Sequence, residues 1–418
     1  MIRYIRFPAN LSPQLRSNFI YFFLDIACWN LYMGSTAIFL TIYASRCGAT
    51  STQIGYLTAL PALLSILVSL PIGQLIRRFP ARSSTIWSAF SMRILFIIYS
   101  IIPWVLPVSH QFEAILILGI IISVPSTVLN VSFSQFFMES VPSEWRGTVL
   151  GVRSAIGSVV SFIVTLSCGQ LLTRVQFPFN YQIVFFIGFV GGITTIYQLT
   201  HIHTVNLQSE VANPILKTSD YHRPEASLSG RSFLPKINKD ALSYLRVISF
   251  LFIYTLIANM VAPLIPNLLV HQLKLSDEWI SIGTASNTII IFIISLFIIK
   301  IAQIIGNRKG NTLGIVALSL QTLILSLARN STHYLISALA GGVATGMLNT
   351  AQTNYLYDHV PPSDQSVWFS LNVWLGNIAI FAGALLGPMI ASHLGTMAAL
   401  ILFGCLEFGI GISMLFWS

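Results

Sequence analysis

Twelve runs of apolar residues, each long enough to cross a bilayer as a helix, follow one another along this chain. A transmembrane helix needs about 20 such residues, because the hydrocarbon core is about 30 Å thick and a helix rises about 1.5 Å per residue. The runs cover residues 17–45, 53–76, 84–106, 113–138, 148–172, 181–202, 244–271, 279–304, 312–329, 333–357, 366–392 and 396–417. The sequence therefore predicts an all-α, polytopic membrane protein with twelve transmembrane helices.

The charges are too few for a water-facing surface. Only 8% of the residues are charged, against about a quarter in soluble domains, which excludes soluble enzymes, nucleic-acid binders and disordered proteins. The net charge is +9, and the basic residues responsible for it lie in short loops between the apolar runs and form no single basic patch. The lipid bilayer is thus the expected partner, and nucleic acid is not.

A polar, Ser- and Pro-containing stretch divides the chain. It separates a predicted six-helix half, residues 1–203, from a second, residues 241–418, and residues 204–240 are interpreted as a cytosolic linker. Counted loop by loop, 16 Lys and Arg lie on the side of the N-terminus and 4 on the other side. The positive-inside rule then places both termini in the cytosol. The expected location is the cell (plasma or inner) membrane.

Two segment pairs indicate an internal duplication. Val128–Pro142 matches Met347–Pro361 at an offset of 219 residues, and Gly73–Arg82 matches Ile299–Arg308 at an offset of 226. Both pairs end on the same predicted side, so the halves are parallel repeats. In such folds the substrate site lies near the midplane, between the halves.

These segments resemble the major facilitator superfamily of secondary transporters along nearly the whole chain. The loop between the second and third spans supplies Gly73, Leu75, Arg78 and Arg82 of the pattern G-x-L-A-D-R-x-G-R-R, and the loop between the eighth and ninth spans supplies Ala302, Gly306, Asn307, Arg308 and Lys309. The connection Val141–Arg153 is also similar. The resemblance implies alternating access of a central site by a rocking motion of the two halves.

The chain departs from the superfamily pattern at positions that bear on gating. Arg77 and Gln303 occupy the two acidic positions of the loops. We therefore expect a different cytosolic gate, in which basic residues of the first half attract acidic residues of the second half. Its candidate residues are Arg77, Arg78, Arg82, Asp358 and Asp364. A solvated basic loop that serves topology alone is the alternative. Span 5 lacks the Gly-Pro element of many drug-proton antiporters, so a drug-exporter assignment is not made.

Four charged residues fall inside the apolar runs, where each costs about 2.5–3.5 kcal/mol on insertion scales. Asp25 and Arg153 are expected at similar depth, and the resemblance implies that their spans, 1 and 5, are neighbours. They are therefore predicted to pair, either as a structural lock or as a proton-coupling pair. Arg93 and Glu407 lie near the midplane of spans in different halves and are not expected to meet.

Polar and aromatic residues on spans 1, 4, 7, 8 and 10 are candidates for substrate binding, and the resemblance implies that spans 1, 4, 7 and 10 line a central cavity. They are Trp29, Tyr32, Thr127, Asn130, Asn259, Asn287, Asn349 and Gln352, with Asn130 and Asn349 at equivalent positions of the repeat. Hydrogen bonding between helices is the competing interpretation of each polar one. The histidines are dispersed over loops and span ends and there is no Walker loop, so no metal, cofactor or ATP site is predicted.

The favoured function is secondary active transport of a small neutral or amphiphilic solute by alternating access, coupled to protons, rather than enzymatic catalysis. The alternatives are a transporter-like lipid flippase and a polytopic membrane transferase. The expected partners are a small-molecule substrate and the bilayer. The sequence is compatible with a monomer and leaves the oligomeric state, the substrate and the direction of transport open.

Overall fold

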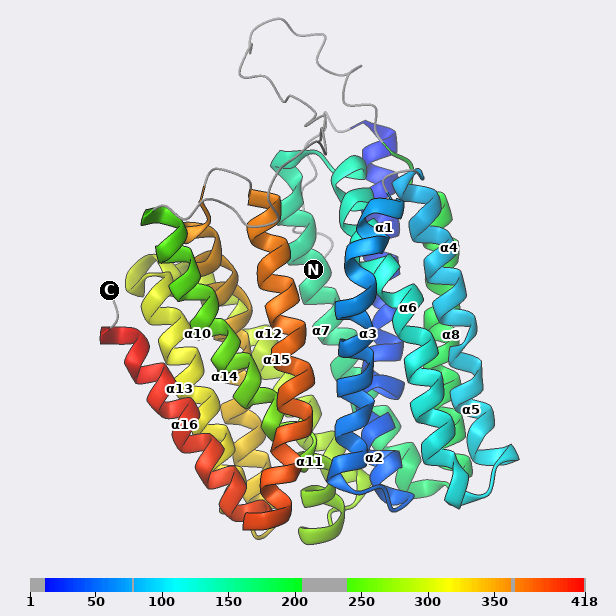
Figure 1. The fold of residues 1–418 in the computed structure, drawn as a ribbon. Helices are drawn as coiled ribbons and strands as arrows, with labels where there is room; N and C mark the ends of the chain where they lie inside the picture. The colour runs from blue at the N-terminus through cyan, green and yellow to red at the C-terminus, as the bar shows by residue number, and fades with distance from the viewer. Residues whose placement is uncertain (1–11, 77–78, 205–238, 362–364, 417–418) are drawn as a thin grey trace, which may run out of the picture.

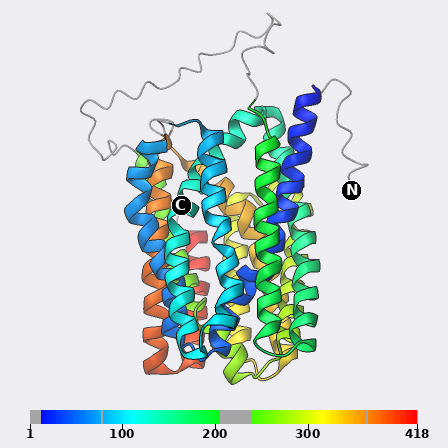
Figure 2. The same ribbon diagram turned by 90° about the vertical axis from the view of Figure 1, so that its right-hand side faces the viewer.

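The computed structural model describes residues 12–76, 79–204, 239–361 and 365–416, and within these ranges every regular element is helical. The helices stand side by side as one bundle (Figure 1), which a view from the side shows again (Figure 2). A helix satisfies its own backbone hydrogen bonds, and for that reason it is the natural form of apolar chain in lipid. The predicted all-α, twelve-helix fold is confirmed.

In the part of the chain that the structure describes, six helical passes precede residue 205 and six follow residue 238. The first half consists of α1 (Pro13–Tyr32) continued by η2 (Met33–Ala37) and α2 (Ile38–Arg46), α3 (Ser51–Ile76), α4 (Ala81–Ile94) with α5 (Phe96–Val105), α6 (Val108–Ser140), α7 (Ser143–Arg174) and α8 (Phe179–His201). The second half consists of α10 (Lys239–Val261) with α11 (Leu264–Asn267) and η3 (Leu268–Gln272), α12 (Asp277–Ile305), α13 (Asn307–Ser326), α14 (Ser331–His359), α15 (Gln365–Leu394) and α16 (Thr396–Phe416).

Several helices extend past the predicted apolar runs. Helix α10 begins at Lys239, so the last two residues of the predicted linker are helical. Helix α6 likewise runs from Val108 to Ser140. Hydropathy marks only the part of a helix in hydrocarbon, whereas the helix itself continues into the polar interface. Among the described residues, ten helical passes are long and apolar enough to cross a membrane, and α13 and α14, which are richer in polar residues, fall below that measure.

Each half has its own buried core. In the first half, aromatic and aliphatic residues of α2, α4, α5, α6, α7 and α8 pack together, with Phe39, Phe96, Tyr181 and Phe185 among the most buried. In the second half, residues of α10, α13, α14, α15 and α16 form a corresponding cluster around Tyr244. Glycines with positive φ, Gly306 and Gly395 (both +83°), make the tight turns before α13 and α16, a conformation that glycine adopts without strain.

The two ends of the bundle can be distinguished by the chain path. At one end, here called the linker end, α1 begins, α8 ends and α10 begins (top of Figure 1). At the other, here called the distal end, α2 and α11 lie close together (bottom of Figure 1). The halves meet along two helix pairs, α7 with α12 and α3 with α15.

Candidate functional site

The distal end carries polar contacts between the halves. The Ser45 hydroxyl, at the end of α2, hydrogen-bonds to Oδ1 of Asn267 in α11 at 2.5 Å, and the Asn267 amide donates to the Ser51 hydroxyl at 3.0 Å. Nε2 of His271 lies 3.0 Å from the Ser45 carbonyl oxygen. Ile42 also packs into a buried cluster that is otherwise formed by the second half. The end of α2 is therefore docked onto the second half.

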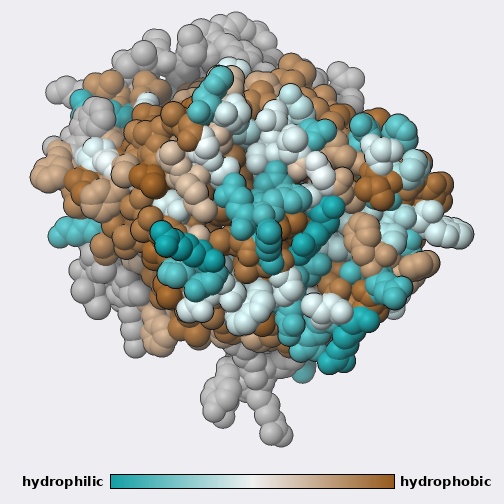
Figure 3. Space-filling view, turned by 90° about the horizontal axis from the view of Figure 1, so that it is seen from below, coloured by the Kyte–Doolittle hydropathy of each residue, from teal (hydrophilic) through white to brown (hydrophobic). Residues whose placement is uncertain are grey.

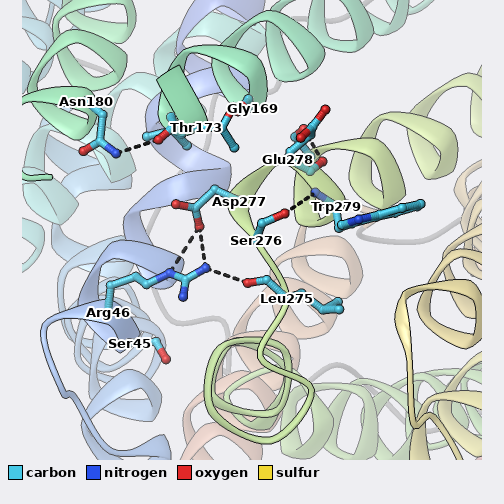
Figure 4. A network of polar contacts seen from close by, with 12 residues as sticks. Ser45, Arg46, Gly169, Thr173, Asn180, Leu275, Ser276, Asp277, Glu278 and Trp279 are labelled. Carbon is cyan, nitrogen blue, oxygen red and sulfur yellow. Dashed lines mark hydrogen bonds and ion pairs between the residues drawn. The ribbon is translucent and has the colours of Figure 1, made fainter. Parts of the chain in front are cut away.

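An ion pair reinforces this docking (Figure 4). Arg46 of α2 contacts Oδ1 of Asp277, the first residue of α12, at 3.0 Å from Nη2 and 3.3 Å from Nε. Nη2 also donates to the Leu275 carbonyl oxygen at 2.7 Å. Viewed from this end, hydrophilic side chains gather across the middle of the face (Figure 3). One guanidinium thus contacts both the segment just before α12 and the first residue of α12.

The same end is closed by two helix crossings that need glycine. A Cβ on Gly55 of α3 would lie 2.3 Å from the Ala384 carbonyl oxygen of α15, and one on Gly169 of α7 would lie 1.7 Å from the Ser281 hydroxyl of α12. At the first crossing Pro388, which has no N–H, leaves the Ala384 carbonyl without its helical donor. That carbonyl instead lies against Gly55.

The two crossings are related by the internal repeat. Gly55 and Ser281 are 226 residues apart, and Gly169 and Pro388 are 219 apart, the same offsets as the two repeated segments. In the repeat, α12 is the equivalent of α3, and α15 is the equivalent of α7. The crossing of α3 with α15 is therefore the repeat equivalent of the crossing of α12 with α7. The structure shows the halves closed on one another at the distal end.

Sequence analysis did not select Arg46 or Asp277, because both lie at the polar ends of apolar runs. The small number of basic residues on the distal side could have identified them. Only 4 Lys and Arg lie in the loops of the distal side, and Arg46 is one of them. A solitary base and an acid at the entry of an apolar run in the other half are the residue types that an interhelical pair requires.

Replacing Asp277 with Asn is expected to weaken the closed distal end modestly. The side chains of Arg46 and Asp277 are 28% and 13% exposed, and partly exposed pairs contribute about 1 kcal/mol or less. We expect an increase of a few-fold in the labelling rate of a cysteine introduced at Ser51. Glu278→Gln, one residue further on, is the matched control and leaves the rate unchanged. Equal rates in both variants would show that the pair does not hold this end closed.

Asp25 and Arg153 lie together deep in the first half. Oδ2 of Asp25 is 3.1 Å from Nη2 of Arg153, and both side chains are buried. Nη1 of Arg153 donates to the Phe22 carbonyl oxygen at 2.9 Å, and its guanidinium lies 5.3 Å from the ring centroids of Phe22 and Phe133. Arg153 therefore keeps three contacts that do not depend on Asp25.

Arg93 lies near this pair but has other contacts. Its guanidinium carbon is 5.4 Å from the ring centroid of Trp29, and its side chain is buried. Glu407, the other buried charge, accepts a hydrogen bond from Thr322 of α13 at 2.8 Å. Arg93 and Glu407 thus contact different parts of the protein.

Two of the candidate aromatic residues face the interior of the first half. The ring of Tyr32 stacks on Phe96 of α5 at 4.2 Å between centroids, and Trp29 contacts both rings at 4.9 and 6.4 Å. These contacts join α1 to α5. Trp29 and Tyr32, two of the candidates for substrate binding, are therefore engaged in packing between α1 and α5.

The polar candidates separate into two groups. Thr127 binds Ser65 of α3 at 3.2 Å, Asn287 donates to the Ala338 carbonyl oxygen of α14 at 3.1 Å, and Asn259 donates to its own helix at Thr255. Thr127 and Asn287 therefore join neighbouring helices, whereas the Asn259 bond lies within α10. Asn130 and Asn349, the repeat equivalents on α6 and α14, are both exposed, and Gln352 is half-buried.

Comparison with known proteins assigns the chain to a family. The sequence model of the Major Facilitator Superfamily matches residues 7–223 and 247–418. The chain belongs to the Major Facilitator Superfamily. A search of curated proteins gave no match. The protein is a membrane transporter of this superfamily and not an enzyme.

Solved structures of the same fold cover nearly the whole chain. A nucleoside transporter, NupG, has 12% identity and a TM-score of 0.63, with 97% of this chain and 98% of that chain covered. A POT family transporter in complex with 5-aminolevulinic acid has 14% identity and a TM-score of 0.69, with 97% and 96% covered. At these identities the likeness is one of fold.

Most of the residues expected to form the cytosolic gate lie outside the residues that the structure describes. Arg77, Arg78 and Asp364 lie outside the described residues, and Asp358 is described as backbone of α14 only. Arg82 is described: it donates to the carbonyl oxygens of Ile202 at 3.1 Å and Thr200 at 2.6 Å. These contacts fasten the start of α4 to the end of α8. Among the described residues, no cluster of His, Cys, Asp and Glu has the arrangement of a metal site.

Proposed function

We propose that this protein carries a small neutral or amphiphilic solute across the membrane by alternating access, in exchange for proton movement. The contacts of the distal end support the first part. Two repeat-related crossings and an ion pair close that end, and in alternating access one end is closed while the other admits solute. The positive-inside bias supports a cytosolic linker end, so this conformation faces the cytosol.

The substrate class is inferred from the polar side chains exposed on the repeat-related helices α6 and α14. Asn130 and Asn349 offer amides, which both donate and accept hydrogen bonds without charge. Gln352 adds a third amide. Trp29 and Tyr32, the aromatic candidates, pack on Phe96 of α5 within the first half. An amide pair suits a neutral solute with both donors and acceptors.

Asp25 is the proposed coupling residue. It is a buried carboxylate in the first half, and its partner Arg153 is held by other contacts. A group with different proton affinity in two states couples proton movement to the conformational change, since coupling is reciprocal. The Asp25 site therefore has the chemistry that proton-driven transport needs.

The experiment that tests this function has two stages. A thermal-shift screen of the purified protein against metabolites identifies a ligand, because binding to the folded state raises the unfolding temperature. Proteoliposomes with an imposed pH gradient then measure accumulation of that ligand, and a parallel assay measures movement of labelled lipid. Accumulation driven by the gradient supports the proposal. Lipid movement without solute accumulation would replace it with the flippase.

Substituting Ala for Asn130 or Asn349 is expected to weaken binding of the identified solute by about tenfold. A net hydrogen bond contributes about 0.5–1.5 kcal/mol, and 1.4 kcal/mol is about a factor of ten in affinity. Isothermal titration measures the change. Asn30→Ala is the control, because the Asn30 amide is bound to the Ile26 carbonyl oxygen within α1. Unchanged affinity in both test variants would remove these amides from the site.

A further inference from the structure

The helix ends at the linker end of the first half are fastened by side chains of neighbouring helices. The last four carbonyl groups of an α-helix have no donor within the helix, and an unsatisfied carbonyl group is costly in a membrane protein. The carbonyl end of a helix also carries a partial negative charge, which attracts a cation. In α6 and α8 these needs are met by an arginine from another helix.

Arg82, in the first turn of α4, binds the end of α8 through one edge of its guanidinium group. Its Nε donates to the Ile202 carbonyl oxygen at 3.1 Å, and its Nη2 donates to the Thr200 carbonyl oxygen at 2.6 Å. Two acceptors side by side suit the rigid, planar fork of donors that arginine has and lysine lacks. Arg82 therefore contributes geometry as well as charge.

The same two nitrogen atoms of a second arginine bind the end of α6. Arg146, in the first turn of α7, donates from Nε to the Val141 carbonyl oxygen at 3.0 Å and from Nη2 to the Met138 carbonyl oxygen at 2.9 Å. The end of α6 is thus tied to the start of α7 by the fork geometry seen between α8 and α4.

The second half repeats the contact of Arg82. Arg308 lies 226 residues after Arg82 and is its equivalent in the internal repeat. Its Nε donates to the Met414 carbonyl oxygen at 3.0 Å and its Nη2 to the Leu415 carbonyl oxygen at 2.9 Å, so it ties the start of α13 to the end of α16. Because both halves have this contact at equivalent positions, it belongs to the repeated architecture.

A buried asparagine joins the ends of α6 and α8 to α1. Asn18 is 0% exposed. Its amide nitrogen donates to the carbonyl oxygens of His203 at 2.7 Å and Ser140 at 3.3 Å, and its Oδ1 accepts from the His203 backbone N–H at 3.0 Å. Since Arg82 holds the end of α8 and Arg146 holds the end of α6, these three side chains link α1, α4, α6, α7 and α8.

We propose that Asn18, Arg82 and Arg146 form a clamp, here called the linker-end clamp, through which the linker end of the first half moves as one body. Its contacts all lie within the first half and persist when the halves separate, unlike the Arg46–Asp277 pair, which joins the halves. Arg82 accordingly acts within its own half and not in a gate between the halves. The inference rests on the two-state movement of the proposed function, but its tests need no solute and fail or succeed separately.

Hydrogen–deuterium exchange of the full-length protein in lipid nanodiscs, followed by mass spectrometry, measures each contact at the helix end that it holds. We expect exchange at the end of α8 to be about tenfold faster or more in Arg82→Gln, as loss of hydrogen bonds from a charged donor predicts. Arg146→Gln has this effect at the end of α6 and Arg308→Gln at the end of α16. Asn18→Leu, which removes three hydrogen bonds at similar volume, accelerates exchange at the ends of both α6 and α8.

The decisive comparison is Arg82→Lys. Lysine keeps the charge that a helix end attracts and that a gate between the halves needs, but its single nitrogen does not reproduce the guanidinium fork. We expect Arg82→Lys to accelerate exchange at the end of α8 nearly as much as Arg82→Gln. The control is Arg16→Gln, which removes the charge of an exposed arginine in the first turn of α1 and leaves exchange at the three helix ends unchanged.

Movement as one body is tested by spin labels on two exposed residues of the first half, Trp87 of α4 and Leu150 of α7, after the native cysteines are replaced. Double electron–electron resonance is expected to give a narrow distance distribution in the otherwise unchanged protein and a broader one in Asn18→Leu. Asn18→Ser supplies the same comparison if the leucine variant does not fold.

Three results would overturn the proposal. Wild-type exchange at the end of α8 in Arg82→Lys would show that Arg82 acts through its charge alone. Faster exchange at only one of the two helix ends in the Asn18 variants would show that the ends of α6 and α8 are not linked. An unchanged distance distribution in the Asn18 variants would show that the clamp does not hold the first half together.

Discussion

Replacing Gly169 or Gly55 with Ala is expected to drive the distal end open. The new Cβ would lie 1.7 Å from the Ser281 hydroxyl or 2.3 Å from the Ala384 carbonyl oxygen. Neither neighbour is the end of a long side chain that is free to turn away, and Ala384 presents backbone. Overpacking of this kind costs about 1–3 kcal/mol, which corresponds to a shift of about 5- to 150-fold between two conformations.

The strain is expected to open the halves rather than unfold either one, because both clashes lie between the halves. Spin labels at Thr52 of α3 and Ser392 of α15, exposed residues at the distal end, report the separation by double electron–electron resonance after the four native cysteines are replaced. The open distal end gives a longer distance between the two labels than the closed one. In Gly169→Ala and Gly55→Ala we expect this longer distance to be the more populated.

The chain supplies matched controls for these substitutions. A Cβ on Gly151, also in α7, or on Gly376, also in α15, meets no atom within 4 Å. Gly151→Ala and Gly376→Ala make the same Gly-to-Ala change in helix propensity without a clash. We therefore expect them to keep the wild-type distances between the labels. Wild-type distances in Gly169→Ala and Gly55→Ala as well would show that these crossings do not set the state of the distal end.

The helices were the most predictable feature, and the reason is the solvent. A bilayer penalises exposed backbone groups, so each long apolar run has essentially one structure open to it. The pairing of Asp25 with Arg153 was predictable on related grounds. A charge inside an apolar run needs a partner at its own depth, and their side chains are 3.1 Å apart.

It was harder to predict from the sequence which faces of the helices pack against one another. Trp29 and Tyr32 share a helical face with Asp25, but the pattern does not say that Phe96 covers them. The roles of Gly55 and Gly169 depend on distances between helices far apart in the chain. Arg46 is the last residue of α2 and Asp277 is the first residue of α12, and hydropathy at such helix ends carries no information on their contact.

Replacing Asp25 with Asn is expected to abolish accumulation of substrate against its gradient and to leave counterflow intact. Asparagine has nearly the same shape and no proton to exchange, so solute still crosses while the link to the pH gradient is lost. Loss of one partner of a buried ion pair costs about 3–5 kcal/mol when the other is stranded. Here Arg153 keeps the Phe22 carbonyl oxygen and the rings of Phe22 and Phe133.

We therefore expect the Asp25→Asn protein to fold, with a lower unfolding temperature than wild type. Glu407→Gln makes the same chemical change at the other buried carboxyl, which Thr322 binds in the second half, and it is expected to keep gradient-driven accumulation. Proteoliposome uptake with and without a pH gradient separates the two variants. If Asp25→Asn folds and still concentrates substrate, its carboxylate is not the coupling group, and its pairing with Arg153 serves to hold α1 against α7.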